Sequence, residues 1–234
     1  MLPLLLPLIW IPLVSVMIFN PIVSVLLATY NTDFNLIKRA IDSVLQQDFQ
    51  NFELLVMDDG SEPTYSKPLH QYALQFPTKV KYLFHPNCGQ SQTINRAIAN
   101  SKGTYITIID ADDEFKPTHL SSCLTYMTTS DLISSTTETV VTDPADFYVP
   151  DKLDHSKVIH VDDCILFATL FGRREVFTGI LFSDMYAADS HFYEQASVTF
   201  STQKVDLRTY IYYRNNPNSI CAKLKSKARL LSAG

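Results

Sequence analysis

The acidic segment Asp110-Ala111-Asp112-Asp113 directly follows the apolar run 105–109. Such a run predicts a buried strand, and α/β sheets bind ligands at the carboxyl ends of their strands. Three carboxylates this close together repel one another unless a cation neutralises them, and a hard divalent ion also takes oxygen ligands from phosphate. The segment therefore predicts metal-assisted chemistry on a phosphorylated substrate. The alternative is an acidic turn in which Asp113 caps a helix beginning near Pro117.

Polar residues also follow two other predicted strands. The apolar run 22–28 leads into Tyr30, and the run 52–57 leads into Asp59. Strands that alternate with helices predict right-handed crossovers and a mainly parallel sheet. We therefore expect Tyr30, Asp59 and Asp112 to lie at one edge of an α/β sheet flanked by helices.

Hydrophobic periodicity predicts the remaining elements. Further strands are expected at 80–84, 132–141, 166–171 and 205–213. Helices are expected at 36–47, at 69–76, between the loop 87–91 and residue 100, and at 187–196, with a short helix or turn at 176–181. The proline- and acid-containing segment 142–157 is expected to be a loop.

Composition limits the class of protein. With 234 residues, 46% of them hydrophobic and 18% charged, the chain can bury one full core, so a single domain is expected. A net charge of -5 argues against a nucleic-acid partner. The glycines form neither a G-x-G-x-x-G fingerprint nor a Walker loop. The four cysteines lack the spacing of a zinc knuckle or redox motif, so we expect them to be reduced and the protein to be cytoplasmic.

Residues 1–20 form an apolar segment whose role stays open. Its length and lack of charge suit a membrane span, but Pro3, Pro7 and Pro12 interrupt it. The segment is a membrane anchor, an extra packed segment, or sequence upstream of the true start. The basic residues between 223 and 229 favour a solvated tail, although an anionic membrane would attract them, so peripheral membrane contact also stays open.

Five motifs follow one another along the chain: Val-Ser-Val-Leu-Leu-Ala-Thr-Tyr-Asn at 23–31, Gln-Asp-Phe-Gln-Asn-Phe-Glu at 47–53, Val-Met-Asp-Asp-Gly-Ser at 56–61, Asn87-x-Gly89, and Ala-Asp-Asp at 111–113. In this order they resemble the motifs of the family 2 glycosyltransferases, which are inverting enzymes with the GT-A fold. The resemblance covers roughly residues 22–125. It implies one GT-A domain at 21–234, with a nucleotide-sugar-binding half at 21–128 and an acceptor-side, catalytic half at 129–234.

The resemblance also implies a nucleotide site. Tyr30 corresponds to the tyrosine near the base and Asp59 to the aspartate that hydrogen-bonds it. Thr29, from the motif of Tyr30, and Asn87 and Gly89, which form a motif of their own, are further candidates for this site. An aromatic face can stack on a base, and a carboxylate can accept from its ring N–H. The simpler alternatives are a tyrosine at the edge of the core and a turn-forming aspartate.

Asp110 and Asp112 match the ends of the D-x-D motif, which in this family holds Mg²⁺ or Mn²⁺ against the diphosphate of the donor. Asp112 is the expected direct ligand. Asp110 either orients the ribose and a metal-bound water or serves as a second ligand. The ion would neutralise charge that grows as the sugar leaves.

Asp189 is the candidate general base, because it lies where family members often show Glu-Asp before an aromatic helix. Inversion requires one carboxylate that takes a proton from the acceptor hydroxyl during in-line attack. The chain departs from the family at Ala188, which replaces the acid, and before Asn95, where an arginine is missing. The alternative role for Asp189 is a helix cap.

The resemblance thus implies sugar transfer from a nucleotide-diphosphate sugar to a glycan, lipid-linked or other hydroxyl acceptor, as in polysaccharide or lipopolysaccharide biosynthesis. A nucleotidyltransferase is disfavoured because residues 28–31 provide neither a Gly-rich loop nor a basic residue for a triphosphate. A non-catalytic nucleotide- or sugar-binding module on the same scaffold stays open, since two family residues are missing.

Overall fold

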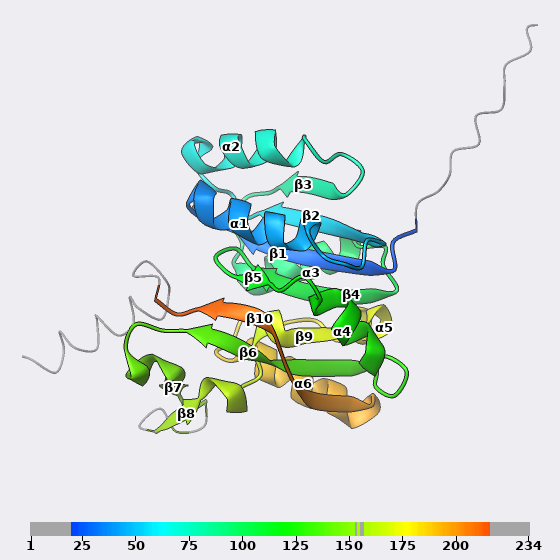
Figure 1. The fold of residues 1–234 in the computed structure, drawn as a ribbon, viewed down its shortest axis with the longest axis vertical. Helices are drawn as coiled ribbons and strands as arrows, with labels where there is room; N and C mark the ends of the chain where they lie inside the picture. Colours follow the sequence, from blue (N-terminus) through cyan, green and yellow to red (C-terminus); the bar gives the residue numbers. More distant parts are fainter. Residues whose placement is uncertain (1–19, 153, 155–156, 216–234) are drawn as a thin grey trace, which may run out of the picture.

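The computed structural model describes residues 20–152, 154 and 157–215. It confirms the α/β class, with an eight-stranded central sheet flanked by helices (Figure 1). The central strands are β1 (Val23–Thr29), β2 (Phe52–Asp58), β3 (Val80–Phe84), β4 (Tyr105–Asp110), β5 (Glu114–Phe115), β6 (Leu132–Val140), β9 (Leu170–Arg173) and β10 (Thr202–Tyr213). The helices are α1 (Phe34–Leu45), α2 (Pro63–Ala73), α3 (Gln90–Asn100), α4 (His119–Tyr126), α5 (Arg174–Gly179) and α6 (Ala188–Thr199).

The central strands follow the order β3-β2-β1-β4-β9-β6-β10-β5. Strand β1 pairs in parallel with β2 and β4, β2 pairs in parallel with β3, and β6 pairs in parallel with β10. Strand β9 is antiparallel to β4 and β6, and the short β5 is antiparallel to β10. The expectation of a mainly parallel sheet is therefore confirmed, with β9 joining its two parallel groups.

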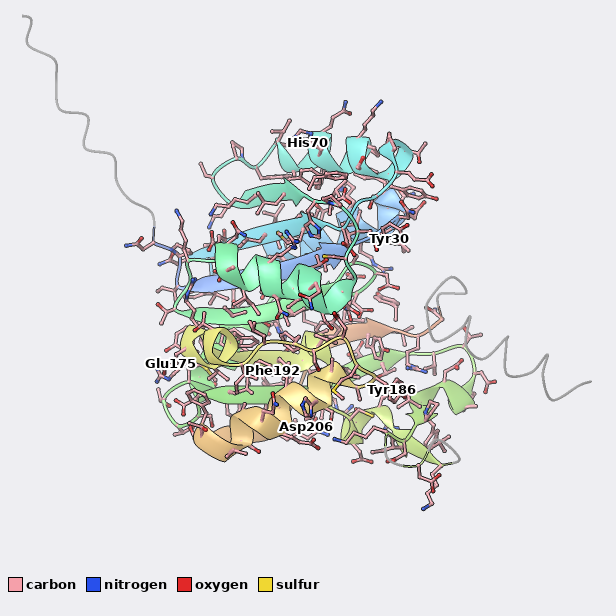
Figure 2. All side chains as sticks on the ribbon, turned by 180° about the vertical axis from the view of Figure 1, so that it is seen from behind. Tyr30, His70, Glu175, Tyr186, Phe192 and Asp206 are labelled. Carbon is pink, nitrogen blue, oxygen red and sulfur yellow. The ribbon has the colours of Figure 1, made fainter. Side chains whose placement is uncertain are left out.

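Two apolar layers cover the sheet, because neighbouring strand residues face opposite sides. Val25 and Leu27 of β1 pack with α1, α2 and α4, whereas Leu26 packs with α3, α5 and α6. Figure 1 shows α1 and α4 on the near face, and Figure 2, viewed from behind, shows α3 and α6 on the other. The strands are thus buried on both sides, which explains why β1, β2 and β4 read as continuous apolar runs.

Several element boundaries differ from the sequence-based expectation. Helix α2 begins at Pro63, six residues before the expected start. Proline fits the first turn of a helix, and the first turns of α2 are too polar to show the hydrophobic periodicity of a helix. Strand β10 begins at Thr202 rather than 205, since its early residues pair with β6. Within the expected strand 166–171, residues Phe167–Thr169 form the 3₁₀ helix η3.

The segment 142–157 was expected to be a loop but contains short ordered elements. Pro144–Phe147 form the 3₁₀ helix η1, and β7 (Tyr148–Pro150) pairs antiparallel with β8 (Val158–His160) in a separate two-stranded sheet. The 3₁₀ helix η2 (Val161–Asp163) follows. The pairing of β7 and β8 is a contact between segments that local composition does not reveal.

The expectations for residues 1–19 and for the basic residues between 223 and 229 lie outside the residues that the structure describes. Among residues 20–152, 154 and 157–215, no helix combines the length and the apolar character needed to cross a bilayer.

Candidate functional site

Three strand ends bring the sequence-predicted residues to one edge of the sheet. In the register of the parallel strands, Thr29 pairs with Asp58, and Ala28 pairs with Asp110. The polar residues after β1, β2 and β4 therefore share one edge, as expected. Figure 2 shows Tyr30 and Tyr186 on this side of the molecule, and Glu175 on the opposite side. This edge, the rim, is where a ligand of an α/β sheet binds.

Asp110 lies partly buried at the end of β4, where the amide of Gln90 in α3 donates to its Oδ1 over 3.2 Å. Burial, and then the negative charges of Asp112 and Asp189, raise the pKa of the Asp110 carboxyl to about 7. Asp189 comes from the second half of the chain, and its carboxylate accepts from the Phe167 N–H of η3, which packs against β4. A divalent cation would relieve this repulsion, and carboxylate oxygens are the donors that Mg²⁺ and Mn²⁺ prefer, so the residues fit such an ion.

Asp113 has a structural role that the sequence did not reveal. Its side chain is fully buried, and it accepts hydrogen bonds from the Tyr210 hydroxyl at 2.7 Å and the Tyr213 backbone N–H at 2.8 Å. Helix α4 has Thr118 as its N-cap, so the alternative in which Asp113 caps that helix is wrong. Asp113 instead ties the acidic segment to β10.

Asp59 is also buried, and its carboxylate is held by the loop before α3. It accepts from the backbone N–H of Cys88 at 2.7 Å, from that of Gly89 at 3.0 Å, and from the Asn87 amide at 3.1 Å. Gly89 has a φ of +89°, a backbone conformation that favours glycine. The structure thus gathers Asn87 and Gly89 around Asp59, a contact between two motifs that their separate places in the sequence did not reveal.

Thr29 and Tyr30 differ in exposure at the end of β1. Thr29 is buried, and its hydroxyl donates to Thr32 Oγ1 over 2.9 Å. Tyr30 leaves 54% of its surface exposed at the rim, so its ring is available to a ligand. This exposure does not fit the alternative of a tyrosine packed into the edge of the core.

Asp189 lies in the first turn of α6, and its carboxylate accepts from the backbone N–H groups of Ser190 at 2.8 Å and Phe167 at 3.2 Å. Burial raises the pKa of Asp189, although these hydrogen bonds partly oppose the rise. Ala187 precedes the helix in the left-handed region at φ +54°. The N-cap of α6 is Ala187, and no side chain caps the helix, so the alternative in which Asp189 is the helix cap is wrong. The Asp189 carboxylate instead joins the first turn of α6 to the N–H of Phe167.

Sequence reasoning did not identify Arg39 of α1. Its guanidinium donates to the backbone carbonyl of Asp112, lies 3.1 Å from Glu114 Oε1, and stacks 3.9 Å over the ring of Tyr213. Arg39 thus holds the acidic segment from the side of α1. In the sequence, Arg39 is only a charged residue on an amphipathic helix, and charged residues on the solvent-exposed face of such a helix look the same.

Asn95, whose neighbourhood departs from the family pattern, joins α3 to the segment before α6. Its amide donates to the Phe182 carbonyl at 2.8 Å and its carbonyl accepts from the Phe182 N–H at 3.0 Å. Nearby, Gln92 donates to Asp184 at 2.9 Å. These contacts position the segment that leads to Asp189.

Comparison with known proteins connects this geometry to one family. A family model described as "Glycosyl transferase family 2" matches residues 24–167, more than half of the chain. An uncharacterized glycosyltransferase of Nostoc sp. is 34% identical over 109 residues, which is 47% of this chain and 34% of that protein. The putative colanic acid biosynthesis glycosyl transferase WcaA of Escherichia coli is 43% identical over 91 residues, 38% of this chain and 32% of that protein. The matches thus span about a third of these relatives' length.

Solved structures show the same fold at low sequence identity. TarS of S. aureus in complex with UDP-GlcNAc gives a TM-score of 0.67 at 19% identity, covering 86% of this chain and 60% of that chain. The mannosyltransferase PcManGT from Pyrobaculum calidifontis, in complex with GDP-Man and Mn²⁺, gives 0.66 at 17% identity, covering 93% of this chain and 66% of that chain. This likeness confirms the expected GT-A type of α/β fold.

Proposed function

The chain belongs to glycosyl transferase family 2, and we propose from this membership that it transfers a sugar from a nucleotide-diphosphate sugar to an acceptor hydroxyl with inversion. One observation carries the proposal. Asp110 ends β4, and antiparallel β9 pairs Phe171 with Thr107, so the preceding η3 lies toward that end of β4. The Phe167 N–H of η3 donates to the Asp189 carboxylate at 3.2 Å. A donor-side carboxylate and a candidate base therefore share the rim, as a single-displacement reaction needs.

The donor nucleotide would bind beside β1 and β2. The exposed ring of Tyr30 can stack on a base, and the Asp59 carboxylate can accept one base N–H in addition to its three protein donors. Thr29, Asn87 and Gly89 would shape this site. The structurally similar TarS and PcManGT bind UDP-GlcNAc and GDP-Man, which supports a nucleotide sugar as the donor.

The diphosphate would lie by Asp112 and Asp110, which would hold Mg²⁺ or Mn²⁺. When bound, this ion supplies positive charge that stabilises the departing diphosphate. Arg39 and Tyr213 keep the acidic segment in place through the Asp112 carbonyl and Glu114. The chain's own contribution is thus a fixed set of oxygen ligands at the rim.

Asp189 would take the proton of the acceptor hydroxyl. As that proton moves to the carboxylate, the acceptor oxygen bonds to the anomeric carbon, and the bond from that carbon to the diphosphate oxygen breaks. The raised pKa of Asp189 makes it a stronger base than an exposed aspartate. The acceptor is a glycan, a lipid-linked sugar or another hydroxyl compound.

Donor turnover tests this proposal. The protein would be incubated with UDP- and GDP-sugars and Mn²⁺, and released nucleoside diphosphate would be measured, with Asp112→Ala as the control. We expect release from at least one donor by the wild type and a loss of at least about 100-fold in the variant. Binding of a donor without turnover would support the non-catalytic module instead, and absence of both would contradict the nucleotide site.

A further inference from the structure

Asp59, His85 and Cys88 direct three different ligand atoms at one small volume next to the nucleotide-side residues. His85 Nδ1 lies 3.5 Å from Asp59 Oδ1 and 3.7 Å from Cys88 Sγ. One ligand atom from each residue lies within 4.8 Å of the other two. With metal–ligand bonds of about 2.0–2.3 Å, neighbouring ligands of a tetrahedral zinc ion are about 3.3–3.6 Å apart. The two distances from His85 Nδ1 lie at or just above this range, and the Asp59 and Cys88 ligand atoms, within 4.8 Å of each other, would move closer as the ion binds.

The surroundings of His85 favour a cation at this point. The ring is 8% exposed, and its Nδ1 faces the Pro86 carbonyl at 2.9 Å as well as the Asp59 and Cys88 side chains. A single proton on Nδ1 can be donated to one of these three acceptors only. Within the part of the chain that the structure describes, the buried Nε2 has no hydrogen-bond partner, whereas the Pro86 carbonyl favours the tautomer with its proton on Nδ1. A metal ion bound at Nδ1 replaces this proton, and three acceptor groups around one ring nitrogen are an arrangement that a cation stabilises.

We propose that Asp59, His85 and Cys88 form a site for a borderline-soft divalent ion such as Zn²⁺, distinct from the oxygen-ligand site of Asp110 and Asp112. Thiolate and imidazole ligands select Zn²⁺ and Co²⁺ over Mg²⁺ and Mn²⁺. Binding releases the thiol proton of Cys88 to solvent, because the thiolate is the ligand. Cys88 is partly exposed, so an ion and a fourth, water ligand can reach the site.

The ion would compete with the donor nucleotide, a consequence that rests on the proposed function. A carboxylate offers about four acceptor positions. Three of those on Asp59 accept from Cys88 N–H, Gly89 N–H and the Asn87 amide. One position remains for either the metal or a base N–H. Zinc would thus inhibit donor binding at this aspartate even where Mn²⁺ supports turnover.

Cobalt absorption tests the site directly. The full chain would be titrated with CoCl₂ without nucleotide, and the near-ultraviolet charge-transfer band of a cobalt–thiolate bond would be recorded. We expect the band in the wild type and in Asp112→Ala, its loss in Cys88→Ser, and at least about tenfold weaker cobalt binding in His85→Gln. Cys164→Ser is the matched control, because Cys164 is another partly buried free cysteine and its loss should leave the band intact.

Two results would overturn the metal site: no band in the wild type at millimolar cobalt, or a band that survives in a Cys88→Ser protein with wild-type circular dichroism. Competition is tested by adding UDP and then GDP to the cobalt-loaded protein. If the band is lost at nucleotide concentrations that saturate the metal-free protein, competition is supported. If the band persists at these concentrations, competition is overturned. If neither nucleotide binds the metal-free protein in calorimetry, the proposed function fails, while the cobalt band still decides the metal site.

Discussion

The Tyr210 hydroxyl donates a 2.7 Å hydrogen bond to Asp113 Oδ2, joining residues 97 positions apart in the chain. The same hydroxyl accepts from the Asp110 N–H at 3.2 Å. One buried tyrosine of β10 therefore contacts both ends of the acidic segment. The second half of the chain thus fixes the conformation of the candidate metal ligands that the first half supplies.

Replacing Tyr210 by phenylalanine should destabilise the protein. The change removes the donor from a fully buried carboxylate, so we expect the free energy of unfolding to fall by about 1–3 kcal/mol in urea titrations. Tyr213→Phe is the matched control, because Tyr213 also donates over 2.7 Å, but to the partly exposed Glu114, which water can solvate. An equal loss of unfolding free energy in both variants would contradict the idea that burial makes the hydrogen bond to Asp113 the more stabilising of the two.

Asp189→Asn should abolish transfer but retain donor binding. Asparagine keeps the shape and one acceptor oxygen, so it can still accept from either the Ser190 or the Phe167 N–H, but it cannot take a proton. We expect turnover to fall by about 10²–10⁴-fold, with nucleotide affinity in calorimetry close to that of the wild type. Asp184→Asn, an exposed aspartate in the preceding segment, serves as the control. Unchanged turnover in Asp189→Asn would eliminate this residue as the base.

Arg39→Lys should weaken the use of Mn²⁺. Lysine keeps the charge but loses the planar fork that reaches both the Asp112 carbonyl and Glu114. Partners that orient metal ligands typically change metal affinity by about 10–100-fold, so the Mn²⁺ concentration for half-maximal donor turnover should rise by this factor. Lys38→Met, which removes an ion pair with Asp42 and a cation–π contact with Tyr72 but no contact to the acidic segment, should leave it unchanged. A normal Mn²⁺ requirement in Arg39→Lys would argue against this positioning role.

Gly103→Ala and Gly179→Ala form a pair that tests close packing against β1. A Cβ at Gly103 would lie 2.5 Å from the backbone N and 2.7 Å from Oγ of Ser24, whereas one at Gly179 would meet nothing within 4 Å. We expect Gly103→Ala to lower the free energy of unfolding by about 1–3 kcal/mol and Gly179→Ala to change it by less than about 1 kcal/mol. Chemical denaturation measures both values, and similar values would refute the packing argument.

His119 should make stability sensitive to acid. Burial lowers the pKa of His119 to about 3, because the charged ring is poorly solvated between Phe115 and Tyr210. A folded-state pKa below the unfolded value of about 6.5 means that the unfolded chain binds the proton first. The contribution of neutral His119 is therefore complete above pH 6.5 and is lost as pH falls from there toward 3, by up to about 1.4 kcal/mol per pH unit.

His119→Gln isolates this effect, because glutamine can still hydrogen-bond the Thr209 hydroxyl but does not titrate. The other titratable groups that face the ring, Cys123 and Tyr210, have raised pKa values and stay neutral in this range. Urea titrations between pH 7 and 5.5 should show a shallower loss of stability in the variant. Parallel curves for the two proteins would show that His119 is not the group responsible.

The sequence alone determined the first half of the fold. Continuous apolar runs and amphipathic helices are local patterns, so β1, β3, β4 and α1 lie within a residue or two of their expected positions. Parallel pairing then brings Tyr30, Asp59 and Asp112 to one rim, because alternating strands and helices leave few other topologies. In the second half, short strands pair with distant partners, and the expected boundaries at 166–171 and 142–157 were wrong.

Only the tertiary structure decided what each acidic residue contacts. Three carboxylates within four residues look alike in the sequence, yet Asp113 is buried against Tyr210, while Asp110 accepts from the Gln90 amide of α3. Arg39, His85 and Cys88 carry no distinctive spacing, and they become informative only beside Asp112 and Asp59. The physical reason is that the charge, solvation and partners of a side chain depend on residues that the fold brings close in space. Hydrophobic periodicity along the chain indicates only which face of a helix or strand is buried.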